Sequence, residues 1–308
     1  MAAMTDTMEN VAASITWEKR RPLEEALPVL SRLGVKKMHL SACEANPVLG
    51  ARRLAEIGAR IRDAGLEVAT YSPGHELGEN SPDALPLKIE AAKALGAGAV
   101  CLSLPDDGRI ARSSGIDGAG RQYREDFHLA EFLASDWKKA LRQLREADLG
   151  MRLVWRTGLP GRSTTETMRS LLSGCRGRDI GVFWYAYGDP LDFRESVTPH
   201  LRAFGRRILD FQFDFNDRGK WFDHYDSYYA KYPQYSVEQK MDKCIQAFRE
   251  CWPQMLAKLP ERALGTVEFR LGERDGESEE FLARQLRELS CALSRTGTAR
   301  KAGKEAGK

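Results

Sequence analysis

The sequence predicts a single-domain (β/α)8 barrel, the TIM-barrel architecture, in which eight parallel strands each precede a helix. Along the 308 residues, short apolar segments rich in β-branched residues alternate with amphipathic segments. Eight such pairs can be traced, and eight is the number of parallel strands that closes a barrel. The runner-up is a doubly wound open sheet, but no G-x-G-x-x-G motif follows any strand, so its dinucleotide-binding form lacks support.

The first half of the chain supplies four strand–helix pairs. Leu23, Ala26, Leu27 and Leu30 recur at the spacing of one helix face, and a glycine closes this segment and the next two helices. A long loop rich in glycine and arginine follows the fourth strand. The predicted strands are residues 11–16, 36–41, 66–71 and 98–104, and the predicted helices are residues 22–33, 50–64, 81–95 and 126–147.

The second half repeats this alternation. The loop after its third strand, residues 215–235, is long and rich in aromatic and acidic residues. Long loops in compact domains are usually functional or disordered, and the aromatic content argues against disorder. The predicted strands are residues 151–156, 180–185, 207–214 and 265–271, and the predicted helices are residues 164–172, 196–204, 236–259 and 279–293.

The barrel is expected to span residues 11–293. Residues 1–10 are polar, without the basic and apolar regions of a signal peptide, and are expected to form a flexible N-terminus. Residues 294–308 lack apolar periodicity and are expected to be a disordered C-terminal tail.

Composition narrows the class of partner. The net charge is only +3, with no concentrated basic face, which argues against nucleic acid as a ligand. No apolar stretch approaches the roughly 18 residues of a membrane span. Six scattered cysteines without a C-x-x-C pair indicate reduced thiols. We therefore expect a cytoplasmic protein with a small-molecule substrate and, as in many barrels, possible homo-oligomers.

The carboxyl ends of the strands are where barrel enzymes carry their chemistry. The candidate ligand-handling residues at or just after these ends are Trp17, His75, Arg156, Tyr185, Gln212, Asp214, Glu268 and Arg270. His75 follows a turn after the third strand and can serve as an acid or base near neutral pH, or as a loop histidine bonded to backbone. His39 lies inside a strand and is expected to pack in the core or against a helix rather than to take part in chemistry.

Two signatures carry a family resemblance. One is the helix and strand over residues 85–102, LPLKIEAAKALGAGAVCL, and the other is the pairing of GMRLVWR at 150–156 with IGVFWY at 180–185. Together they resemble the xylose isomerase-like TIM barrels, a superfamily of sugar phosphate isomerases and epimerases and of endonuclease-four-type enzymes. The resemblance spans roughly residues 10–293.

The resemblance implies a divalent metal site that this chain does not reproduce. The family's strand-five Glu, strand-six Asp and strand-seven His fall on Arg156, Tyr185 and Gln212, and only the strand-eight Glu is matched, by Glu268. A further family His falls on Gly188. A hard dication needs several carboxylate or imidazole ligands, and Arg156 places a permanent positive charge there instead. We expect no metal cofactor and an Arg156–Glu268 ion pair.

Two groups of loops complete the candidate site. The aromatic loop is expected to act as a lid in which Trp221 and His224 contact a sugar-like ligand, or merely to pack on the barrel or a second subunit. A replacement metal cluster within it is disfavoured, because its Asp and His spacing matches no known pattern. Arginine-bearing loops at 105–112 and 157–162 favour an anionic ligand.

The sequence thus predicts a metal-independent enzyme resembling the sugar phosphate isomerases and epimerases. It would act on a small polyhydroxylated or anionic substrate by isomerisation, epimerisation or a lyase step. Glu268 and His75 would transfer protons, and Arg156 would stabilise a developing enolate. The alternative is a non-catalytic barrel that binds a sugar-like ligand or a partner protein. A metal-dependent nuclease is disfavoured by the shortage of histidine ligands and of a basic face.

Overall fold

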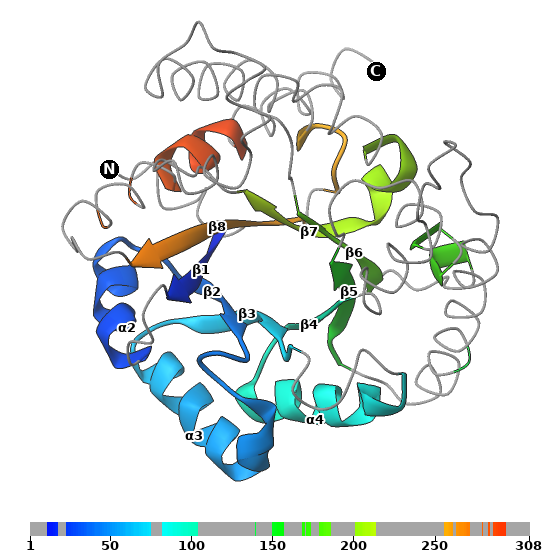
Figure 1. Ribbon diagram of the computed structural model, residues 1–308. Coiled ribbons are helices and arrows are strands. Elements are labelled where there is room, and N and C mark those ends of the chain that lie inside the picture. Colours follow the sequence, from blue (N-terminus) through cyan, green and yellow to red (C-terminus); the bar gives the residue numbers. More distant parts are fainter. Residues whose placement is uncertain are drawn as a thin grey trace, which may run out of the picture.

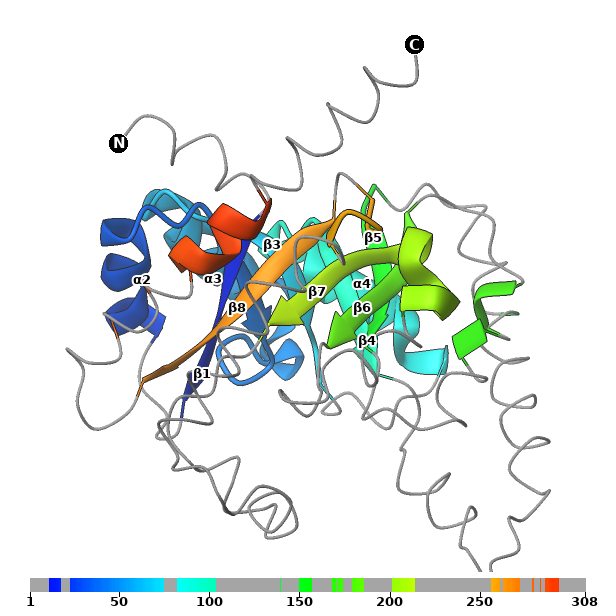
Figure 2. The same cartoon turned by 90° about the horizontal axis from the view of Figure 1, so that it is seen from above.

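Eight parallel strands close into a barrel in the computed structural model (Figure 1). Each strand pairs with the next along the chain, and the last returns to pair with the first. Figure 2 shows the strands from the side. This topology confirms the predicted fold class. The strands are β1 Val11–Trp17, β2 Lys37–Ser41, β3 Glu67–Ser72, β4 Ala99–Ser103, β5 Arg152–Arg156, β6 Ile180–Tyr185, β7 Ile208–Phe213 and β8 Leu264–Leu271.

The structure describes residues 11–17, 23–74, 82–103, 139, 150–156, 168–169, 171–173, 179–185, 201–213, 256–260, 263–271, 279, 283 and 286–293. For residues 15–17, 82, 103, 185, 213 and 267–271 this description covers the backbone alone. The predicted flexible N-terminus, the C-terminal tail and the aromatic loop lie outside these ranges.

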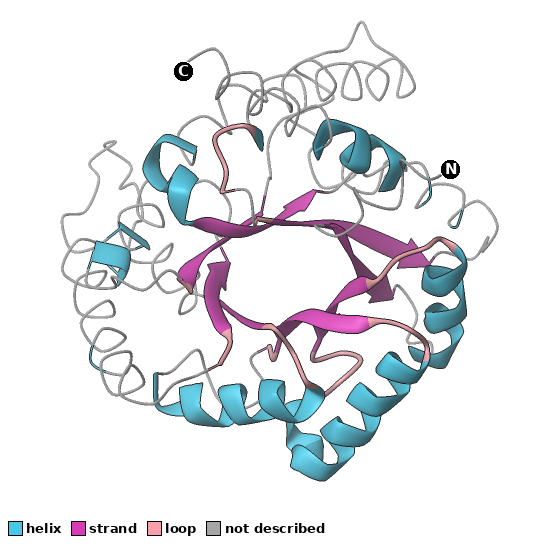
Figure 3. Ribbon diagram, turned by 180° about the vertical axis from the view of Figure 1, so that it is seen from behind, coloured by secondary structure: helices cyan, strands magenta, loops and turns pink. Residues whose placement is uncertain are grey.

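Helices cover the outside of the strand ring (Figure 3). The spacing of Leu23, Ala26, Leu27 and Leu30 is confirmed, since all four are buried on one helix face. The helices are α2 Leu23–Arg32, α3 Gly50–Asp63 and α4 Leu85–Leu95, with 3-10 turns η2 Pro47–Leu49, η3 Pro82–Ala84 and η4 Gly205–Arg207. The predicted helix over residues 81–95 is therefore a 3-10 turn followed by α4.

The predicted helix ends are also confirmed. Gly34, Gly65 and Gly96 have φ values of 74°, 76° and 74°, in the left-handed region that glycine enters without a steric penalty. A glycine serves differently inside α3. A Cβ built on Gly58 would lie 2.4 Å from the carbonyl oxygen of Leu95, so this glycine lets α3 and α4 approach closely.

The strands bury large side chains against the helices. Trp155, Trp184 and Phe211 belong to the main hydrophobic core, and each is at most 1% exposed. These residues directly precede Arg156, Tyr185 and Gln212. Because successive side chains of a strand lie on opposite faces, the residues that follow them belong to the set that lines the barrel.

The barrel interior holds two smaller apolar clusters. One joins Cys101, Val154, Phe183 and Leu209, and the other joins Ala12, Ala69 and Leu264. The remaining interior positions are largely polar, unlike the bulky branched residues that usually fill such barrels. The polar side chains of this interior are Ser14, His39, Thr70, Asp210, Gln212 and Thr266, each at most 9% exposed.

Two irregularities interrupt the strand alternation. Met38 pairs with Val68, but the next residue pairs with Thr70, so Ala69 is an extra residue on β3. In the same way, the β6–β7 pairing passes over Leu209. A bulge changes which face the following residues occupy. Both extra residues pack in the interior clusters, and each is followed by an interior polar residue.

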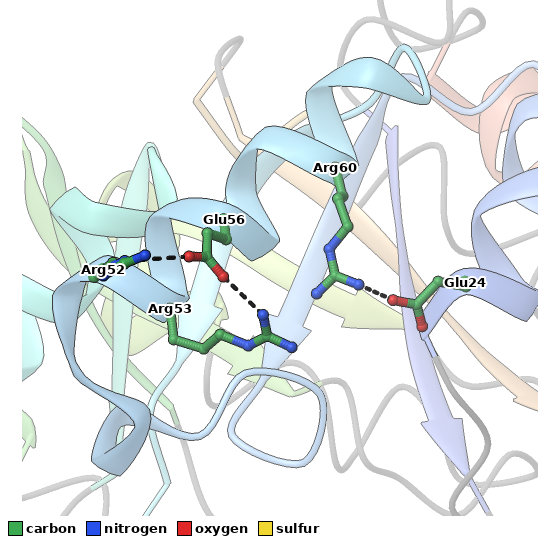
Figure 4. A network of polar contacts seen from close by, with 5 residues as sticks. All are labelled: Glu24, Arg52, Arg53, Glu56 and Arg60. Atoms are coloured by element: carbon green, nitrogen blue, oxygen red, sulfur yellow. Dashed lines mark hydrogen bonds and ion pairs between the residues drawn. The ribbon is translucent and has the colours of Figure 1, made fainter.

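Charged side chains link the outer helices (Figure 4). Arg60 on α3 pairs with Glu24 on α2, and Glu56 receives Arg53 at 2.7 Å and Arg52 at 3.5 Å. All five side chains are more than 40% exposed. Exposed pairs of this kind contribute at most about 1 kcal/mol each, so they support the helix packing without determining it.

Two predictions, the lack of a membrane-spanning segment and the presence of free thiols, can be compared with the described residues. Within those ranges, no helix combines the length and apolar character needed to cross a membrane. Cys43, Cys101 and Cys291 are free thiols, as the cysteine spacing predicts.

Candidate functional site

The carboxyl ends of the strands form one face of the barrel, here called the mouth. Arg156 and Tyr185 end β5 and β6, and Gln212 lies one residue before the end of β7. Arg156 pairs in register with Phe183, and Tyr185 pairs with Gln212. The strand register therefore brings these predicted positions to neighbouring places at the mouth.

Arg156 is an exposed cation above a buried polar interior. It follows the interior residue Val154 by two positions and is itself exposed. Burial lowers the pKa of His39, and the Arg156 charge adds to that shift, whereas burial raises the pKa of Cys101 and the same charge opposes it, so the guanidinium lies within electrostatic range of the buried interior. This position suits a group that receives an anion from solvent while influencing side chains below it.

Gln212 occupies a more enclosed position. Its side chain is only 4% exposed, and it follows the buried Asp210 by two positions on β7. Gln212 therefore belongs to the polar lining of the barrel.

Glu268 and Arg270 lie in the same alternate set of β8 as the interior residue Thr266. Their backbones pair with Ser14 and Thr16 of β1. Trp17 pairs with Leu271 and shares the alternate set of Val11 and Ala13, which pack in the outer core. The register thus separates the position of Trp17 from the positions that line the barrel.

Four predicted site residues lie outside the described ranges. They are His75, Asp214, Trp221 and His224. The arginine-bearing loops at 105–112 and 157–162 lie there too. Their contribution to the site stays a prediction.

A wall formed by the buried His39 and Cys101 and the partly buried Ser72 lies beneath Arg156, and the sequence analysis did not predict it. Nε2 of His39 lies 2.7 Å from Oγ of Ser72, and the Cys101 thiol is hydrogen-bonded to the same serine side chain. The His39 ring meets Phe183 of β6 edge-on, with 5.1 Å between ring centroids. His39 therefore packs inside the barrel and not against a helix. The sequence signal for this placement was that polar residues occupy every second position of β2, namely Lys37, His39 and Ser41.

Burial governs the ionisation of this wall. Loss of solvation, aided by the Arg156 charge, lowers the pKa of His39 to about 3. The same loss of solvation raises the pKa of the Cys101 thiol to about 12, although Arg156 and Ser72 oppose that shift. At neutral pH, His39 is an uncharged imidazole and Cys101 an uncharged thiol.

The depressed His39 pKa predicts acid sensitivity. In the unfolded chain a histidine takes up a proton near pH 6.5, whereas folded His39 does so only near pH 3, so acidification between these values favours unfolding. Between pH 7 and pH 5, His39 should lower the free energy of unfolding by about 2 kcal/mol. Urea unfolding at both pH values should show a smaller loss in His39→Gln. An equal loss in both proteins would contradict the assignment.

A buried ion pair forms the floor of the interior. Asp210 is fully buried, and its two carboxylate oxygens accept hydrogen bonds from Thr70 Oγ1 and Arg152 Nη1, each at 2.5 Å. Burial raises the pKa of Asp210, and Arg152 and Thr70 oppose that rise. Arg152 begins β5 and pairs with Asp210 inside the barrel, whereas Arg156 ends β5 at the mouth. Asp210 is therefore a structural group.

Glu44 follows β2 at the mouth and has a local structural role. Its Oε2 accepts from the Ser41 amide at 2.9 Å and from Ser41 Oγ at 2.5 Å, while Ser41 Oγ accepts from the Cys43 amide at 3.2 Å. This resembles a capping box that fixes the turn. Loss of solvation raises the Glu44 pKa, and its hydrogen bonds oppose that rise.

Lys88 of α4 is the buried lysine of the described chain, at 1% exposure. Its Nζ donates to the Gly74 carbonyl at 3.3 Å, which ties α4 to the segment after β3. Burial lowers the Lys88 pKa. This contact holds the chain just before His75.

Several solved structures have a fold similar to that of this chain. A xylose isomerase domain-containing protein from Salmonella typhimurium matches 92% of this chain and 97% of its own, with a TM-score of 0.55. A xylose isomerase domain protein from Alicyclobacillus acidocaldarius matches 92% and 99% with a TM-score of 0.53, and one from Planctomyces limnophilus matches 94% and 99% with 0.52. Sequence identity is 13% in each case.

These matches confirm the predicted TIM-barrel fold and a resemblance, at the level of the fold, to xylose isomerase domain proteins. No protein-family model matches the sequence, and no curated protein does. At this level of identity the similarity concerns the backbone, so the chemistry has to be argued from this chain's own residues.

Proposed function

We propose that the protein is a metal-independent relative of the sugar isomerases and epimerases. The observation that carries the proposal is the exposed Arg156 at the end of β5, above a polar interior in which His39 is uncharged. The substrate would be a small polyhydroxylated or anionic molecule, and the reaction would move a proton on a carbon beside a carbonyl group. Isomerisation, epimerisation and a lyase step share this first proton transfer.

The proposed chemistry begins at Glu268. Its carboxylate removes a proton from the substrate carbon next to the carbonyl, and the electron pair moves onto the carbonyl oxygen to form an enolate. Arg156 stabilises that negative charge by charge-assisted hydrogen bonds. Protonation of the same carbon on its opposite face, with His75 as the donor, completes epimerisation. Protonation of the neighbouring carbon by Glu268, together with transfer of the adjacent hydroxyl proton to the former carbonyl oxygen, completes isomerisation.

The remaining predicted residues would hold the substrate. Tyr185 and Gln212 would position its hydroxyl groups at the mouth. Trp221 and His224 would cover it, while Asp214, Arg270 and Trp17 would supply further contacts. Because polyols present many hydroxyl groups, a mouth lined by amide, phenol and carboxylate side chains suits them.

The donor set at the strand ends does not fit the divalent cation of the family. It consists of a guanidinium, a phenol, an amide and a single carboxylate, whereas hard cations require several oxygen or imidazole ligands. Among the described residues, no group of three or more His, Cys, Asp or Glu side chains could hold a metal ion. In this proposal Arg156 supplies the positive charge.

Solvent exchange of substrate hydrogen tests the proposal. Purified protein in D2O should introduce deuterium beside the carbonyl of at least one member of a panel of three- to six-carbon aldoses, ketoses and their phosphates. The exchange should persist after prolonged dialysis against EDTA and should not increase on adding Mn²⁺, Co²⁺ or Mg²⁺. Mass spectrometry of the recovered sugars measures the incorporation.

Two other outcomes would redirect the proposal. Exchange that disappears with EDTA and returns with a metal would overturn metal independence. Saturable sugar binding without exchange would favour the alternative, a non-catalytic barrel. The replacement of three of the family's metal ligands also supports that alternative. A cytoplasmic location and possible homo-oligomers remain part of the proposal.

A further inference from the structure

His39 has one satisfied and one unsatisfied ring nitrogen. Nε2 lies 2.7 Å from Ser72 Oγ, whereas Nδ1 is buried and has no hydrogen-bond partner among the described residues. A buried polar atom left without a partner costs about 1–3 kcal/mol. The interaction missing from Nδ1 is one that a ligand oxygen can supply.

The ring is held in a defined place inside the barrel. Ser72 contacts it from β3, and the edge-on packing against Phe183 comes from β6, a strand beyond β4 and β5. The side chain is only 5% exposed. Fixed contacts on two sides leave the imidazole little freedom to rotate, as positioning a reacting group requires.

The strand register relates His39 to Glu268. Ser14 of β1 pairs with His39 on one side and with Glu268 on the other. Neighbouring strands lie about 4.8 Å apart, so these backbones are separated by roughly 10 Å across one small residue. Glu268 and His39 therefore lie on either side of Ser14. The separation of roughly 10 Å between their backbones suits a short sugar chain bound between the two side chains.

We propose that His39, through its Nδ1–H, donates a hydrogen bond to the carbonyl oxygen of the sugar whose neighbouring carbon Glu268 deprotonates. The inference rests on the proposed function and identifies His39 as the residue of that site that polarises the substrate carbonyl. In this assignment the Ser72 hydroxyl donates to Nε2 while the Cys101 thiol donates to Ser72 Oγ, so that the imidazole carries its hydrogen on Nδ1. Arg156 remains the longer-range source of positive charge.

The proton balance is complete within this arrangement. Glu268 takes the carbon-bound proton and becomes a carboxylic acid, and the electron pair moves to the carbonyl oxygen. That oxygen is stabilised by the Nδ1–H hydrogen bond of His39. Glu268 then returns a proton to carbon, and when the former carbonyl carbon receives it, the proton of the adjacent hydroxyl moves to the former carbonyl oxygen. His39 is unchanged overall. No oxidant, reductant or co-reactant is needed.

The uncharged state of His39 supports the assignment. Desolvation and the Arg156 charge hold the imidazole neutral at physiological pH. A neutral imidazole that donates a hydrogen bond can polarise a carbonyl without first losing a proton to the base opposite it. His39 can therefore work beside an ionised Glu268 without neutralising it.

Two isosteric variants separate this role from a structural one. The amide nitrogen of Asn occupies roughly the place of His Nδ1, whereas that of Gln occupies roughly the place of Nε2. If Nδ1 serves the substrate, His39→Asn should retain deuterium exchange within about tenfold of wild type. His39→Gln should then lower kcat by about 10²–10³-fold with KM little changed.

The reverse order would overturn the inference. A histidine that only supports packing through Ser72 and Phe183 would be replaced better by Gln than by Asn. Equal activity in both variants and wild type would also overturn it while leaving the proposed function in place. If wild type exchanges no sugar in the panel, the proposed function itself fails, and the inference fails with it.

A measurement on the wild-type protein avoids any folding defect in the variants. Nitrogen-15 NMR of histidine-labelled protein should show His39 as the Nδ1–H tautomer. Adding threonohydroxamate, a four-carbon mimic of an enediolate, should shift the Nδ1 resonance and leave Nε2 nearly unchanged. Binding of the hydroxamate with no change at Nδ1 would contradict the proposed hydrogen bond.

Discussion

Replacing Asp210 with alanine is expected to lower the free energy of unfolding by about 3–5 kcal/mol. The substitution leaves the Arg152 guanidinium without its carboxylate and removes the acceptor of the buried Thr70 hydroxyl. Arg152 is 21% exposed and keeps some contact with water, which favours the lower part of this range. Because natural domains are stable by only about 5–15 kcal/mol, the variant should melt well below wild type.

A matched surface variant provides the control. Glu56→Ala removes a carboxylate that pairs with two arginines, but on an exposed face of α3. Its cost should be at most about 1 kcal/mol. Urea unfolding of both variants measures the difference. Similar values for the two would mean that the Asp210 pair is not part of a desolvated core.

A compensating double variant sharpens this experiment. Replacing both partners, as in Asp210→Leu with Arg152→Met, removes the isolated charge along with the pair. Buried ion pairs replaced by apolar residues of similar size often leave stability unchanged or raised. The double variant should therefore recover most of the loss seen with Asp210→Ala.

Glu268→Gln is expected to reduce solvent exchange of the substrate proton by about 10²–10⁴-fold. Glutamine keeps the size and hydrogen-bonding capacity of the side chain but cannot accept a proton from carbon. Substrate binding should change little, so the loss should fall on kcat rather than KM. Steady-state exchange rates over a range of sugar concentrations separate the two parameters.

The same chemical change elsewhere in the barrel serves as its control. Glu67 begins β3, at the end of the barrel opposite the mouth, and pairs with Lys37 at 3.5 Å. Glu67→Gln should leave exchange at the wild-type rate. Full activity in Glu268→Gln would remove Glu268 from the reaction, whatever the behaviour of the control.

Local patterns predicted the framework of the fold. The helix faces, the glycines that end α2, α3 and α4, and the eight strands each depend on neighbouring residues, so their signals lie in short segments. The position of Arg156 at a strand end followed from the bounds of the predicted strand, residues 151–156. Short-range sequence information was sufficient for all of these features.

Contacts between distant strands could not be predicted in this way. The bond between Thr70 and Asp210 joins residues 140 positions apart, and His39 meets Phe183 only after the barrel closes. The bulge at Leu209 also reverses the alternation that its strand would otherwise show from Ile208 onward. Counting by twos from the start of β7 would place Gln212 outside the barrel.

The bulges at Ala69 and Leu209 make these two positions better able to lose a residue than regularly paired strand positions are. Val68 and Ile208 pack in the outer core, whereas Thr70 and Asp210 belong to the polar interior. Removing Ala69 or Leu209 would place Thr70 directly after Val68, or Asp210 directly after Ile208, which is regular alternation and leaves each neighbour on its present face. Deleting a regularly paired residue such as Val154 would instead turn over the rest of its strand, so single-residue deletions should be tolerated better at the two bulges.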